Sequence, residues 1–238
     1  MSQLLTALGG GALGAATALA LTIPDMWRQR RRLRAAHKEA THDPLTGVAN
    51  RLGLAEAFEE AQSDGTPSVV VLDIDRFGTI NKVLGHEAGD KLLAQVAVRL
   101  AALGLPVVSV ARLGGDEFVL LVDAHIKQLP GGDPLAGPVW IRTNDADGVA
   151  VTAARDAWRA IAEWPFALDD GREVPITASF GVAVARPGDT LRQLLRRADL
   201  AMLAAKNTGA SVRLAPPTAE PVLERPAVRD RDARHQQS

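Results

Sequence analysis

The sequence predicts an α+β domain in which helices pack on a central β-sheet. Residues 107–111 and 119–122 are rich in β-branched and apolar types, and the paired glycines at 114 and 115 between them are typical of a β-hairpin. Residues 68–74 form an apolar run, as expected of a central strand that is covered on both faces. Strand-like and amphipathic helical segments alternate along the rest of the chain, which is the pattern of a sheet with packed helices.

Helical periodicity, capping residues and turn residues give the expected order of the remaining elements. The expected helices are one capped by Asn50 that stops at 64–67, a short one at 79–84, and others at 92–103, at 151–161 and from Asp189-Thr190 to Gly209. The expected strands, besides those above, are 175–185 and an edge strand at 211–214. Residues 85–90 are expected to form a loop, and 123–149 a loop or insertion with a strand-like piece at 139–141.

Composition narrows the classes of function. The 238 residues, 47% of them hydrophobic, are enough for one good-sized domain with appendages. Lys and Arg number 27 against 28 Asp and Glu, and only 4% of residues are aromatic, so neither a basic surface overall nor a base-stacking platform supports a nucleic-acid partner. Cysteine is absent, which excludes disulfides and thiolate metal sites and leaves carboxylates as the expected metal ligands.

The N-terminal segment has the length and charge pattern of a membrane anchor. Residues 4–23 contain only apolar residues, glycine and threonine, and arginines follow at once, while no basic residue precedes them. This order of charges predicts a retained single-pass span with the rest of the chain on the cytoplasmic side of the inner (cytoplasmic) membrane. The alternative is a buried helix rich in alanine and glycine.

The predicted organisation therefore has four parts. Residues 1–26 form a transmembrane anchor, 27–42 a basic juxtamembrane helix or linker, 43–214 one globular domain, and 215–238 a disordered tail. The arginines of the second part either contact anionic lipid headgroups or are simply solvated, and the sequence leaves both interpretations open.

Acidic residues occur at the ends of two predicted strands. If the chain is still extended there, Asp73 and Asp75 point to the same side, where they repel one another unless a cation or an arginine neutralises them. Asp116 and Glu117 are at the tip of the predicted hairpin, which Gly114 and Gly115 leave uncrowded. Such a tip can hold a metal ion, although an isolated Gly-Gly-Asp-Glu is more often an ordinary hairpin with solvated acids.

Seven motifs, in this order, make residues 43–214 resemble the GGDEF domain of diguanylate cyclases. They are Asp43-Pro44-Leu45-Thr46-Gly47 with Asn50-Arg51, Asp73-Ile74-Asp75-Arg76-Phe77, Ile80-Asn81, Gly85-His86 with Gly89-Asp90, Arg112 to Phe118, Ser179-Phe180-Gly181-Val182, and Arg197-Ala198-Asp199 with Ala204-Ala205-Lys206. Any one of them alone is a weak signal, whereas the whole series is highly specific.

The resemblance implies a fold, a reaction and a cofactor. The implied fold is a nucleotidyl-cyclase-like palm, with a ferredoxin-like central antiparallel sheet flanked by helices. The implied reaction is the condensation of two GTP into cyclic di-GMP with release of pyrophosphate, carried out by a homodimer because each domain holds one GTP. Carboxylate-held Mg²⁺ (or Mn²⁺) would neutralise charge on the phosphate oxygens and acidify the attacking ribose hydroxyl.

The resemblance also implies a role for each matching residue. The metal ligands would be Asp73, the backbone carbonyl of Ile74, Asp116 and Glu117; the catalytic residues Asp116 and Glu117; and the substrate-binding residues Asn81 and Asp90 (guanine), His86, Lys206 (phosphate), Gly114 and Gly115. Taken singly, several have simpler explanations: Asp90 as a helix N-cap, Lys206 as a partner of a helix dipole, Asn81 as a turn residue and His86 as a hydrogen-bonding loop residue.

The sequence departs from the family pattern at positions that matter for activity. Gly78 replaces a lysine that most members carry, Ala210 replaces a second phosphate-binding cation, and Leu203 replaces a common tyrosine. Residues 105–108 lack the Arg-x-x-Asp of the product-inhibition site, so we expect no feedback inhibition by that route. The alternative to an active cyclase is therefore a catalytically degenerate module that binds GTP, or only a partner protein, at the membrane.

Overall fold

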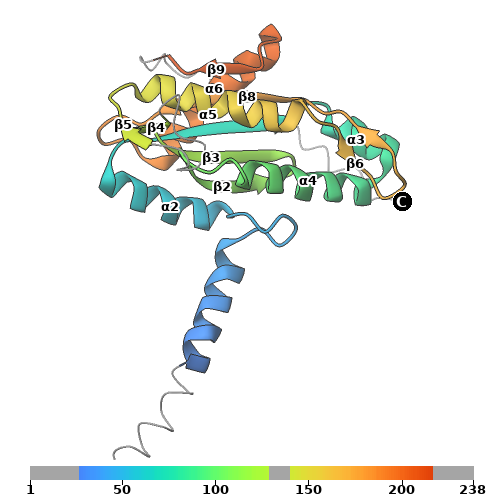
Figure 1. Cartoon of the computed structure of the whole chain (residues 1–238), viewed down its shortest axis with the longest axis horizontal. Coiled ribbons are helices and arrows are strands. Elements are labelled where there is room, and N and C mark those ends of the chain that lie inside the picture. Colours follow the sequence, from blue (N-terminus) through green and yellow to red (C-terminus); the bar gives the residue numbers. More distant parts are fainter. Residues whose placement is uncertain (1–26, 129–139, 217–238) are drawn as a thin grey trace, which may run out of the picture.

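The central sheet of the computed structural model, which describes residues 27–128 and 140–216, has five strands in the order β2-β3-β1-β8-β9 (Figure 1). The strands are β1 (Pro67–Ile74), β2 (Val107–Gly114), β3 (Glu117–Asp123), β8 (Ala178–Val184) and β9 (Val212–Leu214). The buried strand β1 lies in the middle, which confirms its prediction as a central strand. The sheet is mixed, because β9 pairs with β8 in parallel, so the expectation of a purely antiparallel sheet is wrong at this edge.

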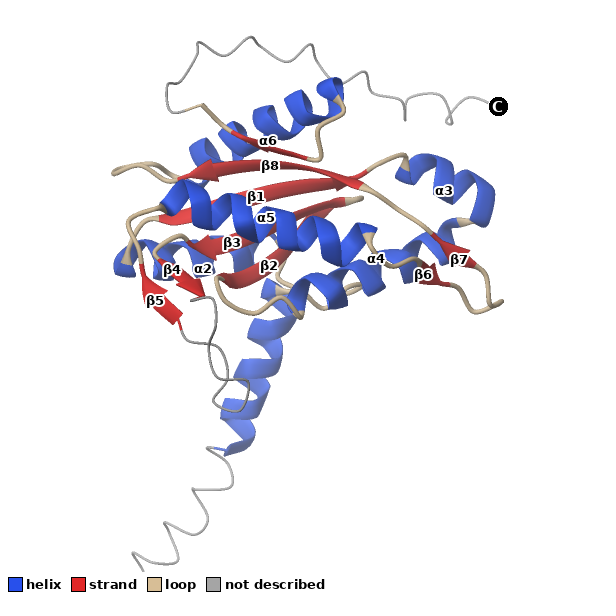
Figure 2. Ribbon diagram, turned by 45° about the horizontal axis from the view of Figure 1, so that its top comes forward, coloured by secondary structure: helices blue, strands red, loops and turns tan. Residues whose placement is uncertain are grey.

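Helices cover both faces of this sheet (Figure 2). They are α2 (Arg51–Asp64), α3 (Phe77–Leu84), α4 (His86–Ala101), α5 (Ala146–Ala162) and α6 (Leu191–Thr208). Successive residues of β1 alternate between the faces, as the pleat requires: Val70 and Leu72 pack in the cluster that contains α4 and α5, whereas Val69 and Val71 pack in the cluster that contains α2 and α6. The two apolar layers together form the core.

The strand β8 and the helix α6 approach one another very closely at Gly181. A Cβ atom placed on Gly181 would lie 1.9 Å from the backbone oxygen of Ala198 and 2.3 Å from the backbone nitrogen of Met202. Only glycine fits between the strand and the helix backbone at this point. This contact fixes the depth at which α6 packs on the sheet.

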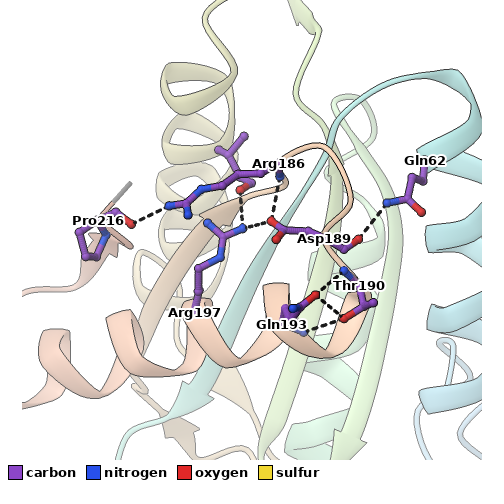
Figure 3. A network of polar contacts seen from close by, with 8 residues as sticks. Gln62, Arg186, Asp189, Thr190, Gln193, Arg197 and Pro216 are labelled. Atoms are coloured by element: carbon purple, nitrogen blue, oxygen red, sulfur yellow. Dashed lines mark hydrogen bonds and ion pairs between the residues drawn. The ribbon is translucent and has the colours of Figure 1, made fainter. Parts of the chain in front are cut away.

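A polar network holds the N-terminal end of α6 (Figure 3). The Asp189 carboxylate accepts hydrogen bonds from the backbone N–H of Arg186, at 2.8 Å, and from the guanidinium of Arg197. Thr190 and Gln193 form a capping box, which satisfies backbone N–H groups at the start of the helix. The hydrogen bonds of Asp189 and the capping box together fix the N-terminal end of α6. Because the helix is rigid, the position of its C-terminal end is then defined as well.

The helix at residues 27–41 is joined to the domain by a compact connection. Asn50 caps α2 by accepting from the backbone N–H groups of Leu52 and Gly53, as predicted, and its amide donates to the carbonyl of Ala40 at 2.8 Å. Ala49 forms a parallel β-bridge with Ala111 of β2. Residues 27–40 themselves are exposed.

Several predicted boundaries differ from the structure. The helix α3 begins at Phe77, and α4 begins at His86, so the loop expected at 85–90 is almost entirely helical. Within 123–149 the strand-like piece predicted at 139–141 corresponds to β5 (Trp140–Arg142), but its pairing with β4 (Ile126–Gln128) and the start of α5 at Ala146 were not predicted.

A second small hairpin was not expected from the sequence. It consists of β6 (Phe166–Ala167) and β7 (Glu173–Val174), and it precedes β8 in the sequence. The strand β8 itself begins only at Ala178. Arg99 of α4 donates to the carbonyls of Trp164 and Pro165, and its guanidinium lies 3.6 Å from the centroid of the Phe166 ring. These contacts attach the hairpin to α4.

The predicted location at a membrane needs correction. Within residues 27–128 and 140–216, no helix combines the length and the apolar character needed to cross a bilayer, and the helix at 27–41 is rich in arginine. A single-pass membrane protein with a cytoplasmic domain is therefore not supported. The span predicted at 1–26 lies outside the described residues, as does the predicted tail from residue 217 onward.

Candidate active site

Four of the predicted site residues meet at one end of the strand pair β1 and β3. Asp73 and Glu117 are register partners in this antiparallel pair, and the backbone N–H of Ile74 donates to the carbonyl of Asp116 at 3.4 Å. Strand pairing therefore brings together acids that are far apart in the sequence. The Asp73 side chain is 25% exposed, so a ligand can reach it.

Lys206, in the last turn of α6, contacts one of these acids. Its ammonium donates to Oδ1 of Asp73 at 2.5 Å. The sequence placed Lys206 at a phosphate site only through the family resemblance, and the structure places it beside Asp73. A cation held between an acid and an accessible surface is suited to receive an anionic substrate, because a metal ion on Asp73 would leave the ammonium free for phosphate oxygens.

Asp116 has an unusual electrostatic environment. Burial raises its pKa above the ordinary carboxyl value, and the nearby charge of Asp73 raises it further. Lys206 and Arg112 lower the pKa, but their effects are smaller. A partly buried carboxyl group whose pKa is raised by a neighbouring carboxylate is the kind of group that a cation or a transferred proton stabilises.

The hairpin turn that carries Asp116 is braced by Arg112. Gly114 and Gly115 have φ values of 146° and 55°, and at both positions a Cβ would meet open space. The Arg112 guanidinium donates to the carbonyl of Gly115 from Nε at 2.9 Å and from Nη2 at 2.8 Å. Its third nitrogen donates to the Asp43 carboxylate, at 3.1 Å from Oδ1. This bracing role of Arg112 was not predicted, although the residue belongs to a quoted motif.

Asp75 does not share the position of Asp73, contrary to the expectation for a continuous strand. The strand β1 ends at Ile74, and the Asp75 carboxylate accepts from the hydroxyls of Thr177 at 2.7 Å and Ser179 at 2.8 Å. Its charge is therefore stabilised by hydrogen bonds at the start of β8. Asp75 serves to order the loop after β1.

The residues at this site could bind a divalent cation, but they supply few side-chain ligands. No group of three or more metal-binding side chains converges within the part of the chain that the structure describes. Asp73 and Asp116 are nevertheless close enough for the charge of one to raise the pKa of the other, and oxygen donors of this kind are the ligands that Mg²⁺ and Mn²⁺ prefer. The pair Asp73 and Asp116 is therefore the place where a cation would be held.

The predicted guanine-binding residues lie on the helix pair α3 and α4. Oδ1 of Asn81 is buried and accepts no hydrogen bond from the described residues, and a Cβ on Gly89 would lie 1.9 Å from it. Asp90 follows Gly89 on the exposed side of α4, and His86 is exposed at its start. The structure thus places a buried, unsatisfied acceptor on α3 near an exposed carboxylate on α4.

A cavity of about 950 Å³ extends from the loop after β1 to the end of α6. Of the predicted site residues only Lys206 lines it, together with Arg76 and Ala210. Arg76 is the one non-glycine residue with a positive φ among the described residues, at 59°, a conformation that costs an L-residue about 1 kcal/mol. A strained cation and Lys206 thus line one space, which is suited to a polyanionic group.

The fold and the site define a palm-like α+β domain, and comparisons with known proteins agree. The GGDEF family model, described as "Diguanylate cyclase, GGDEF domain", matches residues 40–129. The solved GGDEF domain of TpbB from Pseudomonas aeruginosa is 33% identical with a TM-score of 0.57, and the match covers 74% of this chain and 94% of that one. The chain belongs to the GGDEF domain family.

Two other relatives extend this finding. The coiled coil and GGDEF domain of DgcB from Caulobacter crescentus, solved in complex with c-di-GMP, has a TM-score of 0.65 and 26% identity, covering 84% of this chain and 98% of that one. The bifunctional diguanylate cyclase/cyclic di-GMP phosphodiesterase MucR of Pseudomonas aeruginosa is 36% identical over 177 residues, 71% of this chain and 22% of MucR. The chain spans no more than about a quarter of the length of the first curated relatives.

Proposed function

We propose that the chain is a diguanylate cyclase that condenses two GTP into cyclic di-GMP and two pyrophosphates. The observation that carries the proposal is the meeting of Asp73, Asp116 and Glu117 at the ends of β1 and β3, with Lys206 against Asp73. These residue types supply what phosphoryl transfer requires, namely carboxylates for a cation and a proton, and an ammonium for phosphate oxygens.

The reaction makes and breaks the same kind of bond twice. The ribose 3′-oxygen of one GTP attacks the α-phosphorus of the other, the bond from that phosphorus to the bridging oxygen of pyrophosphate breaks, and the hydroxyl proton passes to a carboxylate. Asp116 and Glu117 are the two candidate bases, and the raised pKa of Asp116 favours proton uptake there. A divalent ion held by Asp73, Asp116, Glu117 and the Ile74 carbonyl would neutralise charge on the phosphate oxygens.

Substrate recognition is assigned to two regions that flank the acids. Asn81 and Asp90 would bind the guanine edge, with His86 nearby, while Lys206 and Arg76 would contact phosphates at the cavity that they line. Each domain then holds one GTP, and a homodimer brings two of them face to face. The open tip at Gly114 and Gly115 lets the second nucleotide approach without a steric barrier.

The test is an assay of the full chain with GTP and Mg²⁺ or Mn²⁺, in which cyclic di-GMP and pyrophosphate are quantified. We expect two pyrophosphates for every cyclic di-GMP, and we expect Glu117→Gln to abolish both products while preserving the thermal melting temperature. Failure of the wild-type chain to form cyclic di-GMP under either metal would reject the proposal.

A second candidate function is a GTP-binding module without cyclase activity. Two observations favour it: Gly78 and Ala210 replace cations at the phosphate site, and no three metal-binding side chains converge among the described residues. Calorimetric binding of GTP, measured together with product formation, separates the two candidates. A chain that binds GTP through Asn81 and Asp90 yet forms no product would have the second function.

A further inference from the structure

A groove lies between the helix α5 and the edge strand β9, apart from the acids of the candidate active site. Its volume is about 530 Å³, within the usual range of small-molecule sites. The floor includes Trp158, Val212 and Leu214, which are partly buried against the core. Three exposed arginines, Arg155, Arg159 and Arg213, line the same groove.

The charges of this groove are poorly balanced by the protein itself. Arg159 forms an ion pair with Asp156 at 3.1 Å. Arg213 donates to the carbonyl of Ala204, at 3.3 Å, and to the hydroxyl of Thr208, at 3.4 Å. Within the part of the chain that the structure describes, neither Arg155 nor Arg213 has a carboxylate at ion-pair distance. Three guanidinium groups around one hollow repel one another, and an anion bound between them would relieve that repulsion.

The position of the groove gives it access to the larger cavity. Trp158 and Ser211 line both the groove and the cavity that contains Lys206. The two spaces therefore share a wall. Asp73, Asp116, Asn81 and Asp90 line neither space, so the groove is not part of the guanine site.

We propose that this groove binds a nucleoside phosphate at a second site, distinct from the candidate active site. An apolar floor with a partly buried indole fits the planar ring of a base, and planar guanidinium groups fit phosphate oxygens in pairs of hydrogen bonds. Trp158 and Leu214 contact the base, and Arg155 and Arg213 hold the phosphate. The proposal does not depend on cyclase activity, because it concerns binding alone.

The experiment counts nucleotide sites on the full chain by isothermal titration calorimetry with GTP, in the wild type and in Arg155→Ala/Arg213→Ala. We expect two sites in the wild type, and a loss of at least about tenfold in affinity at one of them in the double variant, because charge-assisted hydrogen bonds to the phosphate are removed. Arg172→Ala is the matched control, since Arg172 is an exposed arginine on the β6–β7 hairpin, paired with Asp170 and outside both cavities. Unchanged binding in the double variant, or an equal loss in the control, overturns the proposal.

Two further measurements test the two halves of the ligand. Trp158→Phe should weaken the binding of GMP in this groove more than that of pyrophosphate, because only GMP carries a base; equal effects overturn the role of the ring. Guanosine, which has no phosphate, should not bind in this groove. If Arg155→Ala leaves the binding of GMP unaffected, the role of the arginines is overturned. Measured cyclic di-GMP formation by the same wild-type preparation tests the proposed cyclase function separately.

Discussion

The charged side chains around Asp73 interact with one another through ion pairs, hydrogen bonds and shifts in pKa. Lys206 pairs with Asp73, Asp73 raises the pKa of Asp116, and Arg112 holds both the turn after Gly114 and the Asp43 carboxylate. The apolar patterns placed Asp73 and the hairpin acids at strand ends, and the resemblance to GGDEF domains implied that they lie together. The sequence did not predict the Arg112 brace or the turn of Asp75 toward Thr177, since both depend on side-chain directions that only tertiary contacts decide.

Removing the charge of Asp73 should change the titration of Asp116. In Asp73→Asn we expect the pKa of Asp116 to fall, because one of the causes that raise it is gone while Lys206 still lowers it. NMR titration of the ¹³C-labelled carboxyl groups measures the change. Asp75→Asn is the control, since Asp75 is hydrogen-bonded to Thr177 and Ser179 and does not contribute to the shift of Asp116. An unchanged pKa in Asp73→Asn would contradict the arrangement.

Asp43 should stabilise the fold in a pH-dependent way. Burial acts to raise the pKa of Asp43, but hydrogen bonds from Thr46 and Arg112 outweigh it, and the net pKa is lowered. A carboxyl whose pKa is lower in the folded state adds stability that is complete above its unfolded pKa and is lost as the pH falls through the folded value.

We therefore expect Asp43→Asn to reduce the free energy of unfolding by about 1.5–3 kcal/mol at neutral pH, and by progressively less as the pH falls below the ordinary carboxyl pKa. Urea unfolding followed at several pH values measures this. The exposed Asp147, replaced by Asn, serves as the comparison variant. A loss for Asp43→Asn that is equal at both ends of the pH range would count against the brace.

A lysine at position 78 should speed the proposed reaction. Gly78 has an ordinary φ, and a Cβ there would meet open space in the first turn of α3, so a longer side chain can be accommodated. Because one oriented cation at a phosphoryl-transfer site is worth about 10²–10³ in rate, Gly78→Lys should raise kcat about tenfold or more. Steady-state pyrophosphate release measures it, and a rate no higher than that of Gly78→Ala would show that the missing charge does not limit turnover.

At the level of elements, α3 and α4 form a unit whose geometry depends on Gly89. The sequence predicted a loop at 85–90 because glycines usually interrupt helices, whereas Gly89 lies inside α4 because the Asn81 side chain occupies the space beside it. Short hairpins such as β6–β7 also escaped prediction, since strands of two residues have no measurable periodicity. Long amphipathic helices and the buried strand β1 were predictable because their patterns repeat over many residues.

Gly89→Ala should therefore impair nucleotide binding more than folding. The new methyl group would clash with Oδ1 of Asn81, which is the end of a flexible side chain and can swing away. We expect the affinity for GTP to fall about tenfold, with a small change in unfolding free energy. Calorimetry and urea unfolding give the two quantities, with Gly78→Ala as the control on the neighbouring helix. A large loss of stability with unchanged affinity would contradict the prediction.

For the molecule as a whole, the position of Lys206 depends on how α6 packs against the sheet. The capping network at Asp189 fixes one end of the helix, the close approach at Gly181 fixes its middle, and Lys206 at the other end contacts Asp73. The sequence predicted the helix and its apolar face. It could not predict the backbone contact at Gly181, because a glycine within a strand has several possible explanations.

Gly181→Ala should lower the stability of the entire domain. The added methyl group would overlap backbone atoms of Ala198 and Met202, which cannot move without shifting α6. Overpacking of this kind costs about 1–3 kcal/mol or more, measured as a lower urea midpoint with an unchanged slope. Gly65→Ala, where the nearest atom belongs to the His125 ring, is the milder comparison. Equal stability of Gly181→Ala and the wild type would refute the close packing.

The bridge between Ala49 and Ala111 also affects how one molecule meets another. A sheet usually ends in a row of unpaired N–H and C=O groups that can recruit a strand from a neighbouring chain. Here Ala49 donates to the carbonyl of Val110 and accepts from the N–H of Arg112, so part of the β2 border is already occupied. The opposite border, β9, is only three residues long and carries Arg213. Both borders thus offer little room for the strand-to-strand stacking that starts aggregation.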